Sequence, residues 1–298
     1  MSSVLEILNL SKDFGRISAV KNLSLQVPKG AVFGILGPNG SGKTTTLAMI
    51  LGASNPTSGS FYWFGENENH QVRKRIGAIL EFPVFYPSFS AEKNLRITAR
   101  IKEVSNERID VVLEMVGLLE RKHDAFKTYS LGMKQRLAIA SAMLCDPDVL
   151  ILDEPTNGLD PQGIAEIRTI IRDIAEQGKT IILASHLLDE VQKVCTDFCI
   201  LKSGNLIYQG KVSDSEQSTS TEIEVGAADK DLEVHLRKIP FVQSVIRVGD
   251  YCRVVVLSGH DAAALNAYLN TMGIHVSYLV TRKESLEEKF LSILNVQS

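Results

Sequence analysis

The eight residues from Gly37 to Thr44 combine glycines, a lysine and a hydroxyl in the pattern G-x-x-x-x-G-K-[ST]. They follow an apolar run, 31–36, typical of a buried strand, and precede a predicted helix that begins at Lys43. Glycines let consecutive amides turn inward around a phosphate, and the helix adds the positive end of its dipole. Lys43 can reach the terminal phosphates, and the Thr44 hydroxyl can ligate Mg²⁺. The pattern predicts a nucleoside triphosphate site formed by Gly37, Pro38, Asn39, Gly40, Ser41, Gly42, Lys43, Thr44 and Thr45.

Two adjacent carboxylates, Asp153 and Glu154, end a second apolar run that begins at Val149. An aspartate at the end of a strand beside a phosphate loop can hold Mg²⁺ through a water. A glutamate one residue later points in another direction and can orient or deprotonate an attacking water. The alternative is that one of the two side chains caps the next helix, because Pro155 follows directly. The chain has no N-K-x-D motif for guanine, so we expect ATP as the nucleotide.

The elements that must position these residues follow from the alternation of short β-rich runs with longer helical patterns. Strands separated by helices predict an α/β fold with a parallel sheet covered on both faces. The predicted strands are 4–10, 24–27, 31–36, 60–64, 149–152 and 180–184, followed by a hairpin at 198–202 and 206–209. The predicted helices are 43–51, 133–143, 161–176 and 187–195, and the section 91–116 is interpreted as helical.

The composition changes at 213–221, a polar, serine-rich stretch that we interpret as a linker. We therefore predict a first domain at 1–212, with a helical insertion at about 91–145, and a second domain at 222–298. The second domain is predicted to contain, in order, strand 222–225, helix 231–239, strands 242–248 and 253–257, helix 262–272, strand 274–280 and helix 285–294. The order β-α-β-β-α-β predicts a small α+β domain of the ferredoxin-like type. Its scattered histidines suggest no metal site, and we interpret it as a structural or regulatory module.

The composition, with 44% hydrophobic and 22% charged residues, excludes a disordered or collagen-like chain. A net charge of −3 gives no overall basic surface, so no nucleic-acid partner is expected. The four cysteines have no zinc or redox spacing and are interpreted as buried apolar residues in a reducing compartment. The first residues lack a signal-peptide pattern, and a turn sequence interrupts the longest uncharged stretch, 44–65, so we expect no membrane span.

Over residues 5–210 the chain resembles the ATP-binding subunits of ABC transporters, on the basis of four ordered motifs. The first is the phosphate loop, and the second is Y-S-L-G-M-K-Q-R at 129–136, which stands at the place of the family signature. The third is L-D-E-P-T-N-G-L-D at 152–160, and the fourth is A-S-H at 184–186. Many unrelated ATPases share a phosphate loop, whereas a signature in this order is specific. The resemblance implies a P-loop NTPase domain of the ABC ATPase type with a helical subdomain.

The resemblance also implies roles for individual residues. Phe14 matches the aromatic residue that stacks on adenine, with a core aromatic near a turn as the alternative. Ser130 and Gly132 would contact the γ-phosphate of the ATP bound to the other subunit. Asp160 would lie in the loop that crosses the dimer interface. His186 would hydrogen-bond the γ-phosphate and complete a catalytic pair with Glu154.

Two positions depart from the family pattern. Glu81 replaces the usual glutamine, and its carboxylate can still ligate Mg²⁺ together with Thr44 and Asp153, unless it is an ordinary surface acid. Leu131 replaces the first glycine of the signature; since leucine disfavours positive φ, the backbone must differ if the family needs that conformation there. The sequence E-F-P at 81–83, together with this signature, is similar to the bacitracin-resistance branch of the family.

The resemblance implies the motor of a transporter, with ATP and Mg²⁺ as cofactors. Two copies, in a homodimer or pseudo-dimer, would meet head to tail with two ATPs between them. A separate integral membrane permease would carry the transport path and dock on the helical insertion. The subunit would then be cytoplasmic and peripheral on the inner face of the cell membrane, and export is the commoner direction in this branch.

Two other functions of such an ATPase fit the sequence less well. A soluble ATPase acting on chromosomes would need a long coiled coil, but only 48 residues separate Glu81 from Ser130. Ribosome-acting members usually hold two ATPase domains, whereas this chain has one phosphate loop. A scaffold that binds ATP without hydrolysis would lack Glu154 or His186, and both are present.

Overall fold

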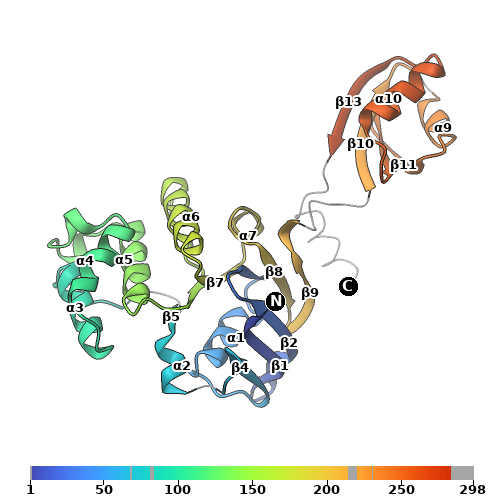
Figure 1. Cartoon of the computed structure of the whole chain (residues 1–298). Coiled ribbons are helices and arrows are strands. Elements are labelled where there is room, and N and C mark those ends of the chain that lie inside the picture. Colours follow the sequence, from blue (N-terminus) through green and yellow to red (C-terminus); the bar gives the residue numbers. More distant parts are fainter. Residues whose placement is uncertain (1, 68, 81–83, 214–219, 230, 283–298) are drawn as a thin grey trace. The chain divides into compact units, whose positions relative to one another are not determined.

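The computed structural model describes residues 2–67, 69–80, 84–213, 220–229 and 231–282. The chain forms two compact units, Met1–Val212 and Ser213–Ser298. Figure 1 shows the elements within each unit.

A six-stranded sheet in the order β5-β6-β7-β3-β8-β9 forms the centre of the first unit. Five strands are parallel, namely β5 (Ile76–Ile79), β6 (Val149–Asp153), β7 (Thr180–Ser185), β3 (Val32–Leu36) and β8 (Asp197–Lys202). The sixth, β9 (Asn205–Lys211), pairs antiparallel with β8. Every residue of β3, β6 and β7 is buried, which explains their continuous apolar sequences. The predicted parallel sheet is therefore present, and it brings the carboxyl ends of β6, β7 and β3 side by side.

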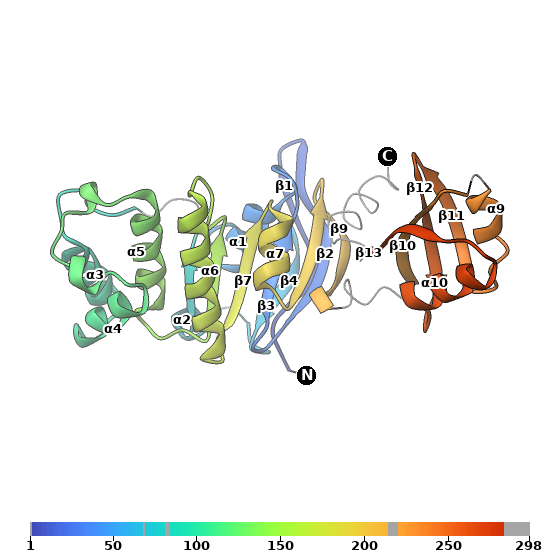
Figure 2. The same ribbon diagram turned by 90° about the horizontal axis from the view of Figure 1, so that it is seen from above.

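Helices cover both faces of this sheet, as Figures 1 and 2 show. Helices α6 (Pro161–Glu176) and α7 (Leu188–Val194) lie on one face, and α1 (Lys43–Ile50) lies on the other. Pro161 is the first residue of α6, where its missing amide costs no hydrogen bond. All four cysteines are free thiols, but only Cys195, Cys199 and Cys252 are buried as predicted, and burial raises the pKa of each of these three. Cys145 is only partly buried, so the prediction is wrong for this residue.

A second sheet, which the sequence analysis did not anticipate, packs into the same core. It is antiparallel, in the order β2-β1-β4, with bounds Ser3–Phe14 for β1, Ile17–Pro28 for β2 and Ser58–Trp63 for β4. β1 and β2 extend beyond the predicted strands and form a hairpin around Gly15. Register shifts between the two strands interrupt the alternation of apolar and polar residues from which the strands were predicted. Asn9 and Asn22, which lie near these shifts, have positive φ.

The helical insertion contains α3 (Ala91–Ile101), α4 (Glu107–Met115) and α5 (Leu131–Met143). A short helix, α2 (His70–Lys74), precedes β5, and the 3-10 turns η1 (Leu119–Arg121) and η2 (Phe126–Thr128) connect α4 to α5. The section predicted as helical at 91–116 is thus two helices, because the chain turns at Glu103, where φ is +57°. Leu95, Val112 and Leu137 are fully buried in the core of this insertion.

In the second unit, the described residues form a four-stranded antiparallel sheet with two helices. Its elements are β10 (Ser220–Ala227), α9 (Leu232–Leu236), β11 (Val242–Val248), β12 (Tyr251–Leu257), α10 (Ala262–Thr271) and β13 (Val276–Arg282). The strand order is β11-β12-β10-β13, and the element order agrees with the predicted β-α-β-β-α-β alternation. The predicted helix at 285–294 lies outside the described residues.

One carboxylate on the sheet of the second unit, Glu224, is buried although it is charged, with 4% of its surface exposed. Arg282 Nε lies 2.9 Å from Glu224 Oε1, and the Tyr278 hydroxyl donates to Oε2 at 3.0 Å. The hydrogen bond to Glu224 raises the pKa of Tyr278. The burial of Glu224 is therefore compensated by partners on neighbouring strands.

Candidate functional site

The phosphate loop connects β3 to α1, as predicted. Gly40 and Gly42 have φ of +78° and +105°, values that side chains rarely adopt. A Cβ on Gly42 would lie 2.6 Å from the Ala19 carbonyl oxygen, so the loop also packs against β2 too closely for any side chain. The loop is tied to the sheet, because the Gly37 amide donates to the Ser185 carbonyl at 3.4 Å.

Lys43 lies inside the loop, with 6% of its surface exposed. Its ammonium donates to the carbonyl oxygens of Gly37 at 2.8 Å and Pro38 at 3.3 Å, and lies 3.3 Å from Glu154 Oε1. The ammonium is therefore held at the centre of the loop by oxygen acceptors. Phosphate oxygens are acceptors of the same kind and carry more charge, so they can take these places.

Thr44 and Asp153 meet at the predicted metal position, where the Thr44 hydroxyl donates to Asp153 Oδ2 at 2.8 Å. Asp153 is buried, with 2% exposed. Hydroxyl and carboxylate oxygens are the ligands that Mg²⁺ prefers. Because Thr44 and Asp153 offer one of each in contact, these two residues fit the cation. Glu81, the third predicted ligand, lies outside the described residues.

Glu154 and His186 are brought together from the ends of β6 and β7. Glu154 has φ of +49°, and its amide donates to the Ala184 carbonyl at 2.9 Å. Its second carboxylate oxygen, Oε2, lies 2.8 Å from His186 Nδ1. The alternative that Asp153 or Glu154 caps the next helix is wrong, because Asp160 is the N-cap of α6 and accepts from the Gly163 amide at 2.9 Å.

Phe14 is exposed, with 53% of its surface accessible, so the alternative of a core aromatic is wrong. It stands at the end of β1, in the hairpin whose second strand carries Ala19 beside the phosphate loop. The Lys12 ammonium lies 5.0 Å from the centre of its ring. An exposed aromatic face at this end of the hairpin is available for stacking on a planar base.

The signature residues lie at the start of α5. Ser130 is the N-cap and accepts from the Met133 amide at 3.2 Å, and Leu131 is the first helical residue. Leu131 therefore has ordinary helical φ, and its departure from glycine causes no strain. Burial raises the pKa of the Tyr129 hydroxyl, which donates to the Arg121 carbonyl at 2.7 Å and anchors the chain just before Ser130.

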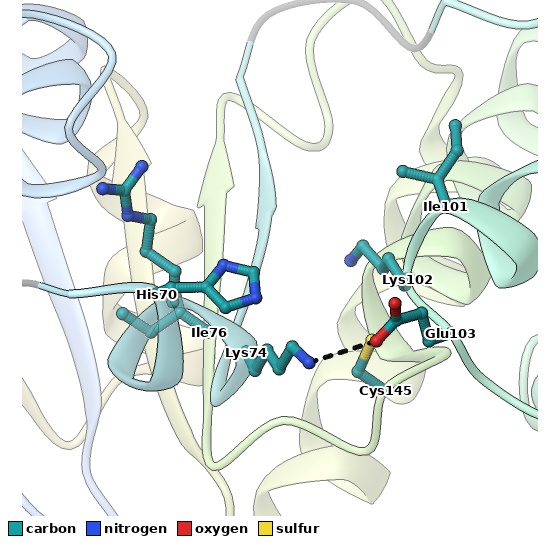
Figure 3. Close-up of a pocket in the computed structure, with 8 residues that line it drawn as sticks. His70, Lys74, Ile76, Ile101, Lys102, Glu103 and Cys145 are labelled. Atoms are coloured by element: carbon teal, nitrogen blue, oxygen red, sulfur yellow. Dashed lines mark hydrogen bonds and ion pairs between the residues drawn. The ribbon is translucent and has the colours of Figure 1, made fainter.

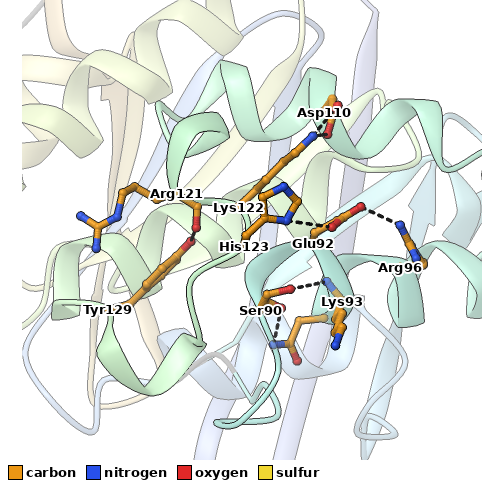
Figure 4. Close-up of polar contacts among 10 residues, drawn as sticks. Ser90, Glu92, Lys93, Arg96, Asp110, Arg121, Lys122, His123 and Tyr129 are labelled. Atoms are coloured by element: carbon orange, nitrogen blue, oxygen red, sulfur yellow. Dashed lines mark hydrogen bonds and ion pairs between the residues drawn. The ribbon is translucent and has the colours of Figure 1, made fainter.

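Polar contacts join the segment before the signature to α3 (Figure 4). The Glu92 amide donates to the Lys122 carbonyl at 3.0 Å, and Glu92 Oε2 lies 3.3 Å from His123 Nδ1. Lys122 in turn donates to Asp110 of α4 at 2.8 Å. The position of the signature is thus linked to the position of α3.

A hollow of about 480 Å³ lies beside the signature. It is lined by Ser130, Leu131, Gly132, Met133, Arg136, Gly158, Leu159, Asp160, Gln162, Gly163 and Glu166. This lining includes the predicted Ser130, Gly132 and Asp160, but no residue of the phosphate loop. The predicted site residues therefore form two groups in one chain, one around Lys43 and one around Ser130. The sequence analysis missed Gln162 and Glu166, although their spacing after Asp160 places them on the first turns of α6.

The comparison with known proteins decides the family. The ABC transporter family profile matches residues 20–157. The chain is 35% identical over 306 residues to the bacitracin transport ATP-binding protein BcrA of Enterococcus faecalis, covering 99% of this chain and 97% of that protein. The chain belongs to the ABC transporter family.

Two further relatives extend this ABC assignment. The Nod factor export ATP-binding protein I of Cupriavidus metallidurans is 40% identical over 218 residues, covering 71% of this chain and 72% of that protein. The dimeric structure of the ATP-binding cassette MJ0796 bound to ADP and Pi matches with a TM-score of 0.62 and 25% identity, covering 70% of this chain and 98% of that one.

These findings confirm the resemblance seen in the sequence, including its bacitracin branch, and do not favour the soluble ATPase. This ABC subunit binds and hydrolyses ATP. In the part of the chain that the structure describes, no helix has both the length and the apolar composition to cross a bilayer.

Proposed function

We propose that two copies of this subunit bind two Mg²⁺-ATP head to tail and drive export through a separate permease. The contacts among Lys43, Glu154 and His186 carry this proposal, because they join a cation for the phosphates to a base for the water. The phosphate loop binds the triphosphate, Phe14 stacks on adenine, and Thr44 and Asp153 hold Mg²⁺. Glu81 completes the cation site.

The hydrolysis step follows from the chemistry of these side chains. Bound Mg²⁺ neutralises charge on the phosphates. Glu154 accepts a proton from the attacking water at its carboxylate, and His186, hydrogen-bonded to Glu154, orients that carboxylate and contacts the γ-phosphate. Lys43 exchanges its loop carbonyls for phosphate oxygens and stabilises their charge.

The head-to-tail dimer is supported by the separation of the two groups of site residues. The hollow beside Ser130, Gly132 and Asp160 contains no phosphate-loop residue, and in the proposed dimer a second chain supplies one. The N-terminus of α5 opens at Ser130, and a helix N-terminus favours an anion such as a γ-phosphate. The related cassette MJ0796 forms a dimer with ADP and Pi.

The permease is proposed to dock on the outer face of α3. Three cations, Lys93, Arg96 and Arg100, are exposed along this helix, together with Ile101. They border a hollow of about 600 Å³ that also contains Ile97. A cationic rim around apolar side chains fits an amphipathic segment with acidic residues. Export as the direction is supported by the Cupriavidus relative, which is a Nod factor export protein.

A neighbouring cleft of about 280 Å³ separates α2 from the end of α3 (Figure 3). Lys74 Nζ lies 3.4 Å from Glu103 Oε2 across it, and both side chains are largely exposed. Ile101 lines both this cleft and the α3 hollow, so the two adjoin. The proposed docking surface therefore extends from α3 to α2.

A pull-down tests the proposed partner. The Glu154→Gln protein, loaded with Mg²⁺-ATP, is used as bait on detergent-solubilised membranes of the source organism. We expect one polytopic membrane protein to be recovered and to be lost when Arg100→Glu is added. Arg172→Glu, a matched charge reversal on the exposed side of α6, should leave recovery unchanged. Recovery only of ribosomes or nucleic acid, or equal recovery with both variants, would contradict the docking proposal.

A further inference from the structure

Glu190 on α7 is a buried carboxylate to which no role has been assigned above. It is 2% exposed, and its Oε2 accepts a hydrogen bond from the Ser185 hydroxyl at 3.1 Å. Its Oε1 has no hydrogen-bond partner among the described residues. Burying a carboxylate costs free energy unless it is paired, so a residue kept in this state calls for an explanation.

The Ser185 hydroxyl joins Glu190 to the turn that carries His186. Ser185 is fully buried, and its Oγ accepts from the Leu187 amide at 3.0 Å. This hydrogen bond closes a short side-chain turn in which His186 is the residue enclosed. A serine hydroxyl has one proton, and here the proton is donated to Glu190. The carboxylate thus fixes the hydroxyl so that a lone pair faces the Leu187 amide.

The same end of β7 is attached to both parts of the ATP site. The Ser185 carbonyl accepts from the Gly37 amide of the phosphate loop at 3.4 Å, and the Ala184 carbonyl accepts from the Glu154 amide at 2.9 Å. With these backbone contacts in place, the direction of the His186 ring depends on the turn that the Ser185 hydroxyl closes. That turn directs Nδ1 to within 2.8 Å of Glu154 Oε2.

We propose that Glu190 is a positioning residue for His186, acting through the Ser185 hydroxyl. Glu190 does not touch the nucleotide. It restricts the turn to the one geometry in which the imidazole meets the catalytic carboxylate. Its contact is with a hydroxyl and not with a backbone amide at the start of α7, so helix capping does not account for it. This proposal goes beyond the ATPase activity and does not depend on the permease.

Three variants of the purified full chain test the proposal. Glu190→Leu removes the acceptor and replaces it with an apolar side chain of similar length. Glu190→Gln keeps an oxygen that can accept from Ser185, and Asp189→Asn is a matched control on the exposed side of α7. Steady-state ATP turnover gives kcat and KM separately, and thermal unfolding shows whether each variant is folded. We expect Glu190→Leu to lower kcat roughly 10- to 100-fold, the range for loss of a group that orients another functional side chain. KM for ATP should stay within about twofold, and Glu190→Gln should recover most of kcat.

A double-mutant cycle separates positioning from general stability. Ser185→Ala removes the shared hydroxyl and should lower kcat by the same factor as Glu190→Leu. The double variant should then lose no more than either single variant, because both changes remove one connection. Wild-type kcat in folded Glu190→Leu, or losses that multiply in the double variant, would overturn the proposal. If Glu190→Leu does not fold, Ser185→Ala decides, and an unchanged kcat in that variant would overturn it.

Discussion

Replacing Glu154 by glutamine should separate ATP binding from ATP hydrolysis. Glutamine nearly matches glutamate in shape, so it can keep the contact with His186 Nδ1, which lies 2.8 Å from Glu154 Oε2. The amide is not basic, however, so it cannot accept a proton from water. Loss of a general base typically lowers the rate by about 10²- to 10⁴-fold, which corresponds to about 3–5 kcal/mol in the activation barrier. The cost to folding should be small, because the Lys43 ammonium also donates to the Gly37 and Pro38 carbonyl oxygens and the amide oxygen of glutamine can still accept from it.

The assay is ATP turnover by the purified chain at saturating Mg²⁺-ATP, with nucleotide affinity measured by calorimetry in the same buffer. ATP affinity should be unchanged or higher, because the neutral amide competes less for the Lys43 ammonium. Full turnover by the Glu154→Gln protein would rule out Glu154 as the general base, since another residue would then activate the water. Weakened ATP binding would equally contradict this role, because Glu154 would then serve binding and not chemistry.

Three further changes test individual parts of the site. Lys43→Ala should abolish detectable ATP binding in calorimetry, because it removes the ammonium at the centre of the phosphate loop; unchanged affinity would contradict the assignment. Gly42→Ala should weaken ATP binding and lower the free energy of unfolding by about 1–3 kcal/mol, since φ is +105° and the new Cβ would lie 2.6 Å from the Ala19 carbonyl oxygen. If the denaturant unfolding curve of Gly42→Ala coincides with that of the wild type, the loop accommodates the new Cβ without loss of stability. Phe14→Ala should reduce ATP affinity by about 1–3 kcal/mol and Phe14→Trp should not, if the exposed ring stacks on adenine. Equal ATP affinities of the Phe14→Ala and Phe14→Trp proteins would show that adenine does not stack at this position.

Local rules were enough to predict the phosphate loop and the central sheet from the sequence. The loop needs glycine where φ is positive, as at Gly40 and Gly42, and strands buried on both faces, such as β3, have unbroken apolar sequences. The meeting of Asp153 with Thr44 also followed, because the parallel strands β6 and β3 end at the same edge of one sheet.

What the sequence analysis missed depends on contacts that form only in the folded chain. The strands of the second sheet were predicted, but their pairing into a separate sheet was missed, and β1 and β2 were predicted too short because register shifts near Asn9 and Asn22 break their alternation. The connection of Glu190 to Ser185 was missed because it requires the first turn of α7 to fold back over the end of β7. Asp153 and Glu154 allowed a capping role on sequence grounds alone. Only the structure shows that Asp160 is the cap of α6.

The proposed head-to-tail site is tested most directly by the mass of the ATP-loaded Glu154→Gln protein, measured by light scattering with and without an added Ser130→Arg change. We expect Mg²⁺-ATP to double the mass of the single variant. We expect Ser130→Arg to leave ATP bound to a monomer, because in the proposed dimer Ser130 meets the phosphate of the partner and not that of its own chain. A dimer that forms equally well with Ser130→Arg, or loss of ATP binding by the monomer, would contradict the head-to-tail site.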